Sequence, residues 1–390
     1  LADELHQYAA NSGQGDAMGE LFTAAKKCIG MTATLINGYA SGIFYLLYRM
    51  CAYRMEQDGQ EYTRPSRFAY EYGVCETAYE ISEGGYNSNR RSVKRKKRER
   101  QRPGVSPLVY SRFLLENGVF LSLMDMGKEL PEYEEIPVPL RLPESQQRAY
   151  DDLEHAFHEI FKDRSREGRK PAQKLLSVSL NLMMAYPDQP YGHQPVLHPV
   201  TRDPLVVPQS SGAPDEATEK DRQALDIIRR KVSCSECVLL YVNWVRLDSR
   251  TRLLRLLTES GIRAEIMEDT VPPRKREEWV ENHLRQGMQV MITNPNLVET
   301  GLDLNDFTTL IFYDVAFKLF TFRQASRRSW RINQTAPRVE VYILYYRNTM
   351  QERAVRLMAS KLAVAGVIDG GVLTDEGLAA MSECEDMTTA

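Results

Sequence analysis

The sequence contains no apolar run approaching the roughly eighteen residues of a membrane span, and no signal-peptide pattern at its start. Its six cysteines are scattered along 390 residues without the spacing of a disulfide framework. The formal net charge of −3 is small for this length, which argues against a protein that coats polyanions with its whole surface. We therefore expect a protein of the reducing cytoplasm, with room for two or three domains.

Two familiar binding patterns are also missing. The phosphate-binding pattern G-x-x-x-x-G-K-[ST] does not occur, and the glycine-containing stretch 12–15 lacks its lysine and hydroxyl, so we predict a turn there. Cys234 and Cys237 have the spacing of half a zinc site, but no second Cys or His pair accompanies them. We therefore expect no zinc site.

The most informative stretch runs from Met291 to Gln334. A strand pattern leads into Gly-Leu-Asp-Leu at 301–304, a second strand is expected at 310–313, and Asp314 closes it. We expect the next segment, with Arg328 and Arg331, to be helical. Arginines three residues apart on a helix point the same way, with Cβ atoms about 5–6 Å apart. Two adjacent guanidinium groups favour a clamp for a polyphosphate over a structural core.

These residues resemble known helicase motifs. The segment 301–304 with its following strand and Asp314 resembles motif V of the superfamily 2 helicases and translocases. The segment 324–334 (QASRRSWRINQ) resembles motif VI of their Snf-type, chromatin-remodeller-like branch, Q-A-x-x-R-x-x-R-I-G-Q. This chain departs from that pattern at Trp330, where the branch usually has His, and at Asn333, where it has Gly. Neither departure touches the two arginines.

The resemblance assigns roles to motifs V and VI. It implies that Arg328 and Arg331 reach the γ-phosphate of ATP and stabilise its transition-state charge. It also places Gln324 in the catalytic site. Gly301 and Asp303 are expected to bind the nucleotide.

The first residues, LADELH, resemble a DExH box, the Walker B motif of the same superfamily. The resemblance implies that Asp3 holds Mg²⁺, usually through water, and that Glu4 lies at the metal and polarises the attacking water. His6 would couple the nucleotide site to the other lobe. Alone, the four-residue match is weak, and an acidic helix start is the alternative. Because this motif opens the chain, we expect the phosphate loop upstream of Leu1, in a larger protein.

The segment 28–38 (CIGMTATLING) resembles motif III of the same superfamily. The resemblance implies that Thr32 and Thr34 relay between Walker B and the lobe interface. The alternative is a capped turn from a strand into a helix, with Asn37 or Ser41 at the helix N-terminus.

The basic run 89–103 (NRRSVKRKKRERQRP) is the strongest shift in composition. Such a run cannot bury a face, so we expect a mobile loop that either tracks nucleic-acid phosphates or is simply a solvated insertion. Its central residues are candidate nucleic-acid contacts: Arg95, Lys96 and Lys97. The resemblance adds four candidates at strand ends in the second lobe: Asn243, Trp244, Thr293 and Asn294.

We predict an α/β protein with tandem RecA-like parallel-sheet lobes, the first truncated at its N-terminus, and a mostly helical or irregular insertion between them. The expected parts are lobe 1 at 1–52, an insertion at 53–140 with the basic loop, a helical region and loop at 141–217, lobe 2 at 218–368, and a tail at 369–390. Strand and helix patterns alternate regularly through 218–368.

The function implied is an ATP- and Mg²⁺-dependent motor, most simply a translocase on double-stranded DNA. A strand-separating helicase on DNA or RNA shares every motif found here. A third alternative, from another class, is a nucleotide-dead scaffold that binds nucleic acid or protein partners. The missing phosphate loop permits that alternative, whereas Asp3, Glu4, Arg328 and Arg331 speak against it.

Overall fold

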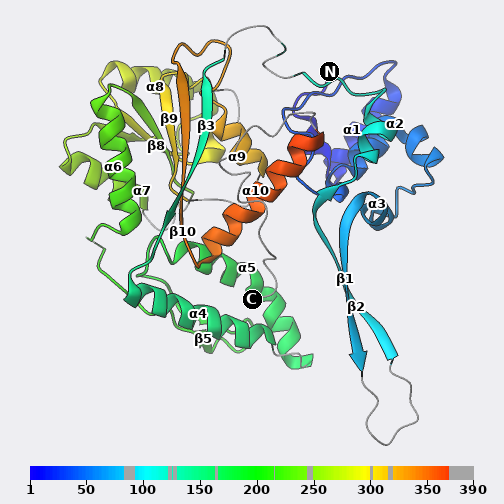
Figure 1. Ribbon diagram of the computed structural model, residues 1–390, viewed down its shortest axis with the longest axis horizontal. Helices are drawn as coiled ribbons and strands as arrows, with labels where there is room; N and C mark the ends of the chain where they lie inside the picture. The colour runs from blue at the N-terminus through cyan, green and yellow to red at the C-terminus, as the bar shows by residue number, and fades with distance from the viewer. Residues whose placement is uncertain are drawn as a thin grey trace, which may run out of the picture. The chain divides into compact units, whose positions relative to one another are not determined.

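The computed structural model describes residues 1–82, 93–121, 125, 130–162, 166–214, 216–243, 249–298, 302–314 and 319–368. The chain forms two compact units, the first made of 1–125 and 358–383 and the second of 126–357 and 384–390. Figure 1 shows their helices and strands. Within the described residues, no helix is long and apolar enough to cross a membrane.

The first unit is built mainly from short helices. Its elements are η1 (Leu5–Tyr8), α1 (Gly13–Ala24), η2 (Ala40–Gly42), α2 (Phe44–Gln57), α3 (Pro65–Tyr72), β1 (Gly73–Ser82), β2 (Val93–Val105) and η3 (Tyr110–Leu114). The predicted turn at 12–15 is wrong, because Ser12 caps α1 by accepting a hydrogen bond from the Gly15 N–H. A Cβ atom at Gly15 would lie 2.3 Å from Nη1 of Arg49, so glycine makes room for that arginine.

The two N-terminal motifs are joined by backbone hydrogen bonds within this unit. Ala2 and Gly30 form a parallel bridge. The Ala2 N–H donates to the Ile29 carbonyl at 2.8 Å, and the Met31 N–H donates to the Ala2 carbonyl at 2.7 Å. Residues 1–5 and 29–31 therefore run side by side, as adjacent parallel strands of a first lobe would.

The basic run is a strand rather than a loop from Val93 onward. β2 pairs antiparallel with β1, and Figure 1 shows the two strands as a ribbon extending from the helices of this unit. Glu76 of β1 pairs with Arg102 of β2 at 2.7 Å. The predicted loop is wrong there because a complementary strand, which supplies backbone partners and a carboxylate, precedes the basic run.

The second unit contains a six-stranded parallel sheet in the order β3-β10-β9-β6-β8-β7. Its strands are β3 (Glu132–Leu140), β6 (Cys237–Tyr241), β7 (Ala264–Ile266), β8 (Val290–Thr293), β9 (Phe307–Phe312) and β10 (Arg338–Tyr346). The connecting helices are α6 (Glu219–Ser233), α7 (Ser249–Glu259), α8 (Arg276–Arg285), α9 (Leu319–Ser326) and α10 (Met350–Ile368), with short turns η6 (Pro273–Lys275) and η7 (Pro295–Leu297). The predicted parallel α/β lobe is confirmed.

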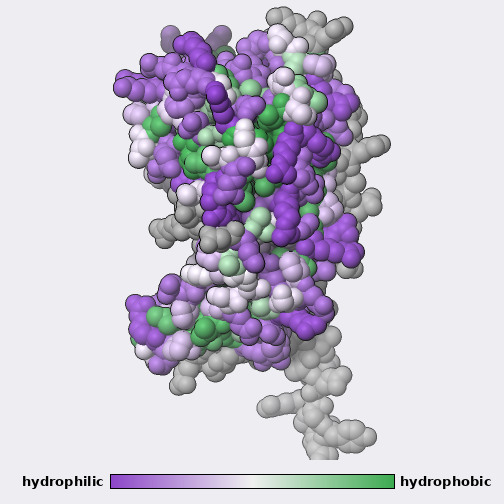
Figure 2. All heavy atoms as spheres, turned by 90° about the vertical axis from the view of Figure 1, so that its left-hand side faces the viewer, coloured by the Kyte–Doolittle hydropathy of each residue, from purple (hydrophilic) through white to green (hydrophobic). Residues whose placement is uncertain are grey.

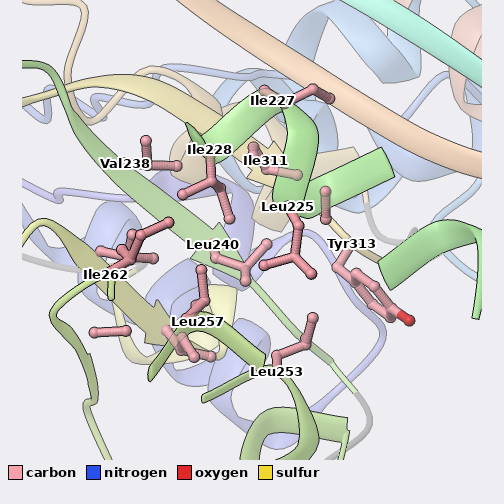
Figure 3. Close-up of a cluster of buried hydrophobic side chains, with 14 of the residues drawn as sticks. Leu225, Ile227, Ile228, Val238, Leu240, Leu253, Leu257, Ile262, Ile311 and Tyr313 are labelled. Carbon is pink, nitrogen blue, oxygen red and sulfur yellow. The ribbon is translucent and has the colours of Figure 1, made fainter. Parts of the chain in front are cut away.

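Helices cover both faces of this sheet. On one face, α6 and α7 pack against alternate strand residues, including Val238, Leu240 and Ile311 (Figure 3). On the other face, the Phe312 and Phe322 rings lie 4.7 Å apart, and the Tyr241 hydroxyl donates to the Ala325 carbonyl of α9 at 3.0 Å. The strands are apolar on both sides because both sides are buried.

The edge strand β3 lies in the segment that the sequence placed in the insertion. It pairs in parallel with β10, with Pro137 opposite Ile343 and Pro139 opposite Tyr345. Two prolines two residues apart leave their missing N–H groups on the same side of a strand, and an edge strand has one open side. Pro137 and Pro139 exclude a helix but are compatible with an edge strand whose other side makes no ladder hydrogen bonds in the described part of the chain.

A second core lies beside the sheet in the same unit. α4 (Glu144–Lys162) and α5 (Arg166–Ala185) pack with the small hairpin of β4 (Val196–Leu197) and β5 (Pro204–Val206) around Tyr150, Phe157 and Tyr186.

On the molecular face drawn in Figure 2, hydrophobic residues occur in small groups among hydrophilic ones.

Buried charges tie this region to the sheet. The Lys220 ammonium at the start of α6 lies 2.5 Å from Asp188, and both side chains are fully buried. It also donates to the Gln351 side chain at 2.8 Å. Arg252 pairs with Asp221 at 3.1 Å beside them.

Candidate nucleotide and nucleic-acid sites

The DExH and motif III residues meet through their side chains. Nδ1 of His6 lies 2.9 Å from Oγ1 of Thr32 and 3.2 Å from a carboxylate oxygen of Glu4. The Thr32 hydroxyl donates to the Thr34 carbonyl at 3.0 Å. That hydroxyl therefore accepts from His6, which assigns the hydrogen to Nδ1. The Nδ1–H of His6 therefore lies between two acceptors, the Glu4 carboxylate and the Thr32 hydroxyl, and the hydroxyl bonds onward to the Thr34 backbone.

Asp3 and Glu4 differ in their surroundings. Asp3 is exposed, and its Oδ1 accepts the Glu4 N–H at 2.9 Å. Glu4 has left-handed backbone angles, φ 49° and ψ 49°, which side chains adopt rarely. An exposed carboxylate fits Mg²⁺, which is usually held by one or two carboxylates plus waters and phosphates. Within the described part of the chain, no group of three or more His, Cys, Asp or Glu could hold a metal.

Motifs V and VI meet in the second unit, but not in the predicted form. α9 ends at Ser326, so Gln324 lies on the helix whereas Arg328 and Arg331 lie beyond it. The helical placement of the two arginines is wrong. The Ser326 hydroxyl bonds back to the Arg323 carbonyl at 3.2 Å, and Ser329 donates to the Leu304 carbonyl at 2.9 Å. These bonds replace the next turn of the helix.

Both arginines nevertheless converge on one carbonyl oxygen. Arg328 donates to the Leu302 carbonyl at 3.4 Å and Arg331 donates to it at 3.5 Å. Arg331 also pairs with the Asp303 carboxylate at 2.5 Å. Arg328 is 9% exposed, whereas Arg331 and Asp303 are accessible to solvent. The structure thus brings together Arg328, Arg331 and Asp303, which the sequence assigned to one site; Gly301 lies outside the described residues.

The strand-end candidates are only partly available to a ligand. Asn243 binds Asp314 twice, through its backbone N–H at 2.5 Å and its side-chain amide at 2.9 Å. Asn294 donates to the Asn243 carbonyl at 3.2 Å. Thr293 is fully buried and its hydroxyl donates to the Met267 carbonyl, so its side chain is committed to the interior.

The remaining nucleic-acid candidates are less fully defined. Trp244 lies outside the described residues. Arg95, Lys96 and Lys97 lie on β2, where Glu80 is opposite Arg95 and Tyr79 is opposite Lys96. The structure describes their backbone and register but not their side chains.

A cavity of about 360 Å³ lies elsewhere in the second unit. It is lined mainly by apolar residues of α5 and the β4–β5 hairpin, including Leu175, Leu182 and Val196. No residue assigned to the nucleotide site lines it.

In this parallel α/β lobe, the two arginines meet the segment that carries Leu302 and Asp303. Residues 219–333 match the family described as "Helicase conserved C-terminal domain". The chain is 26% identical over 137 residues to the ATP-dependent helicase fft1 of Schizosaccharomyces pombe, a match covering 35% of this chain and 14% of that protein. Residues 219–333 thus carry a helicase C-terminal domain, and the resemblance to the superfamily 2 helicases read from the sequence is confirmed.

A solved structure, the C-terminal part of the Fun30 ATPase domain, is also similar. It has a TM-score of 0.46 and 14% identity, and the match covers 61% of this chain and 97% of that one.

Sequence reasoning missed how the segment 327–334 is anchored. The Trp330 indole donates to the Pro131 carbonyl at 2.8 Å, and Gln334 donates to the Asn305 carbonyl at 2.8 Å. The only signal was the departure from the family pattern at position 330. A bond between residues 199 positions apart has no local sequence signature.

Proposed function

We propose that this chain is part of an ATP-driven motor on nucleic acid, and that the motor translocates along double-stranded DNA. The convergence of Arg328 and Arg331 on the Leu302 carbonyl carries the proposal. Two guanidinium groups within reach of one oxygen stand close enough to share a polyphosphate ligand. The helicase C-terminal domain over 219–333 supports the same class of activity.

In the proposed mechanism, ATP with Mg²⁺ supplies the phosphoryl group that is transferred to water. Asp3 would hold the metal, because its carboxylate is exposed and is a hard oxygen donor. Glu4 would orient and polarise the attacking water. Its 3.2 Å contact with His6 keeps the carboxylate from turning freely. Because the same Nδ1 of His6 also contacts the Thr32 hydroxyl, the ring lies between this carboxylate and the motif III backbone.

Arg328 and Arg331 would stabilise the negative charge that develops on the transferred phosphoryl group. An arginine in this role is worth about 10³ to 10⁵ in rate. Arg331 is held by Asp303 in this structure, so the ligand would have to compete with that carboxylate. Such competition would make the clamp sensitive to the presence of a phosphate group.

The basic ribbon β1–β2 would contact the phosphate backbone. The segment 90–102 contains nine Arg or Lys residues and one Glu, an excess far beyond what the ribbon's own carboxylates can balance. Contacts of this kind are independent of sequence and weaken with salt. Asn243 and Asn294, at the ends of β6 and β8, are further candidates for backbone contacts.

The proposal is tested by comparing stimulation of ATP hydrolysis in the full-length protein by duplex DNA, single-stranded DNA and RNA. A duplex translocase is stimulated most by duplex DNA. Stronger stimulation by a single strand would favour a strand-separating helicase. Nucleic-acid binding without any hydrolysis would favour the scaffold. The cytoplasmic location stays a prediction.

A further inference from the structure

The segment that carries the two arginines is an irregular connection fastened on two sides. It runs from the end of α9 at Ser326 to the start of β10 at Arg338. On one side, Ser329 and Gln334 bind the carbonyls of Leu304 and Asn305. On the other side, the segment meets the start of the edge strand β3.

That second attachment is made by Trp330. Its indole N–H donates to the Pro131 carbonyl at 2.8 Å, and its ring lies 5.3 Å from the Tyr133 ring at an angle of 47°. The Arg327 guanidinium lies 5.5 Å from the Trp330 ring centre and 6.0 Å from that of Tyr133. A hydrogen bond, an aromatic pair and a cation–π contact thus act at one point.

The attachment point is itself fixed. The Glu132 N–H donates to the Pro337 carbonyl at 2.9 Å, and β3 then pairs with β10 over its whole length. Trp330 therefore binds directly before a strand that is hydrogen-bonded to β10 along its length. A tryptophan provides both the indole donor and a large ring area, whereas the smaller imidazole usual at this position has a donor but less ring area.

We propose that Trp330 is a positioning residue, which fastens the Arg328–Arg331 segment to β3 and so holds the two arginines ready for the phosphate. The proposal rests on the proposed function for its catalytic consequence, but the attachment can be tested without hydrolysis. Trp330 lies two residues after Arg328 and directly before Arg331. Freeing it would let the arginines leave the Leu302 carbonyl.

The first experiment is limited trypsin digestion of the native full-length protein, following cleavage after Arg327, Arg328 and Arg331. Losing the hydrogen bond and aromatic pair in Trp330→Ala should raise the cleavage rate there about tenfold or more. Trp330→Phe keeps a ring but loses the donor, so its cleavage rate should lie between those of the wild type and Trp330→Ala. Trp279→Ala removes another half-buried tryptophan, stacked on His283 in α8, and should leave these sites unchanged.

The second experiment tests whether Trp330 acts through β3. Tyr133→Ala removes the partner ring without changing a residue of the arginine segment, and it should also raise cleavage at these sites. The two changes should be less than additive when combined, because they break one attachment. Additive effects, unchanged cleavage in Trp330→Ala, or a uniform rise at every arginine and lysine of the chain would overturn the proposal.

The catalytic readout separates this proposal from the proposed function. If the motor assignment holds, Trp330→Ala lowers kcat while the KM for ATP changes by less than about threefold, because a transition-state contact is lost rather than uniform binding. Absence of hydrolysis in the wild type would contradict the proposed function alone. Normal kcat together with faster cleavage would contradict the positioning role alone.

Discussion

Nδ1 of His6 and Oγ1 of Thr32 lie 2.9 Å apart, although the two residues are 26 positions apart in the chain. This contact joins the two N-terminal motifs directly. It also sets the direction of the hydrogen bonds, since the threonine hydroxyl is already donating to the Thr34 carbonyl. The motifs are therefore one structural arrangement, and changes in either should be felt by the other.

Thr32→Val tests this link. Valine has the shape of threonine but no hydroxyl, so the His6 ring loses one of its two partners and turns more freely beside Glu4. We expect kcat for nucleic-acid-stimulated hydrolysis to fall about tenfold, the scale of one polar interaction in a site, with little change in ATP binding. Thr23→Val is the matched control, because that exposed hydroxyl only bonds to Gly19 of its own helix. Equal effects of the two changes would contradict the link.

The Asp16 carboxylate should give the first unit a pH-dependent stability. Hydrogen bonds from Tyr62 at 2.6 Å and from Arg49 at 2.9 Å hold the pKa of Asp16 below its ordinary value of 3.8. Because the folded-state pKa is depressed, the contribution is present above 3.8 and is lost as the pH falls through the lowered pKa. Asp16→Asn should therefore be less stable near neutral pH, with a gap that closes in acid.

The measurement is the melting temperature of wild type and variant across that pH range. Tyr62→Phe removes the hydrogen bond that lowers the pKa of Asp16 most, while the charge on Asp16 stays. In the Tyr62→Phe background, Asp16→Asn should therefore lower the melting temperature near neutral pH by less than it does in the wild type. A difference between wild type and Asp16→Asn that is constant with pH would show that the ionised carboxylate is not responsible.

The buried pair Lys220–Asp188 should be costly to break from one side. Lys220→Met would leave Asp188 buried, where desolvation already raises its pKa, without its nearest cation. We expect a loss of about 3–5 kcal/mol in the free energy of unfolding, measured by urea denaturation. Lys162→Met, which removes an exposed pair with Glu159 at 3.4 Å, should cost less than about 1 kcal/mol. Similar losses of unfolding free energy in Lys220→Met and Lys162→Met would show that the buried pair contributes no more than an exposed one.

The ribbon β1–β2 should contribute to nucleic-acid affinity through charge alone. Replacing Arg95, Lys96 and Lys97 together by Gln should weaken binding to all sequences alike. It should also reduce the slope of log K against log salt by up to about 3, since each lost phosphate contact removes about 0.9 on B-form DNA. Lys26→Gln with Lys27→Gln, two exposed charges of the same unit, is the control. An unchanged salt slope in the triple variant would mean that the ribbon does not touch the phosphates.

The sequence predicted the second lobe well for a physical reason. Strands such as 237–241 and 290–293 are short apolar runs between amphipathic helices, and a parallel sheet buried on both faces demands that pattern. Motif order likewise predicted that Arg328, Arg331 and Asp303 belong together, which the structure shows.

The features that sequence reasoning missed depend on long-range partners. β3 reads as a proline-rich connection, and its strand character exists only because β10 lies beside it. The basic run reads as a loop, and β1 makes it a strand. The arginines read as helical, but the Ser329 and Trp330 side chains bind distant carbonyls and end that helix early. Local propensity cannot report such partners.

The role of Arg328 at the phosphate is tested most directly by nucleic-acid-stimulated ATP hydrolysis in the full-length protein with Arg328→Ala, with nucleotide binding measured separately. Wild type should hydrolyse ATP faster when nucleic acid is present. The variant should lose this stimulation, by about 10³-fold or more, while still binding the nucleotide. Equal loss of hydrolysis and nucleotide binding, or full activity in the variant, would contradict the role of Arg328 at the phosphate.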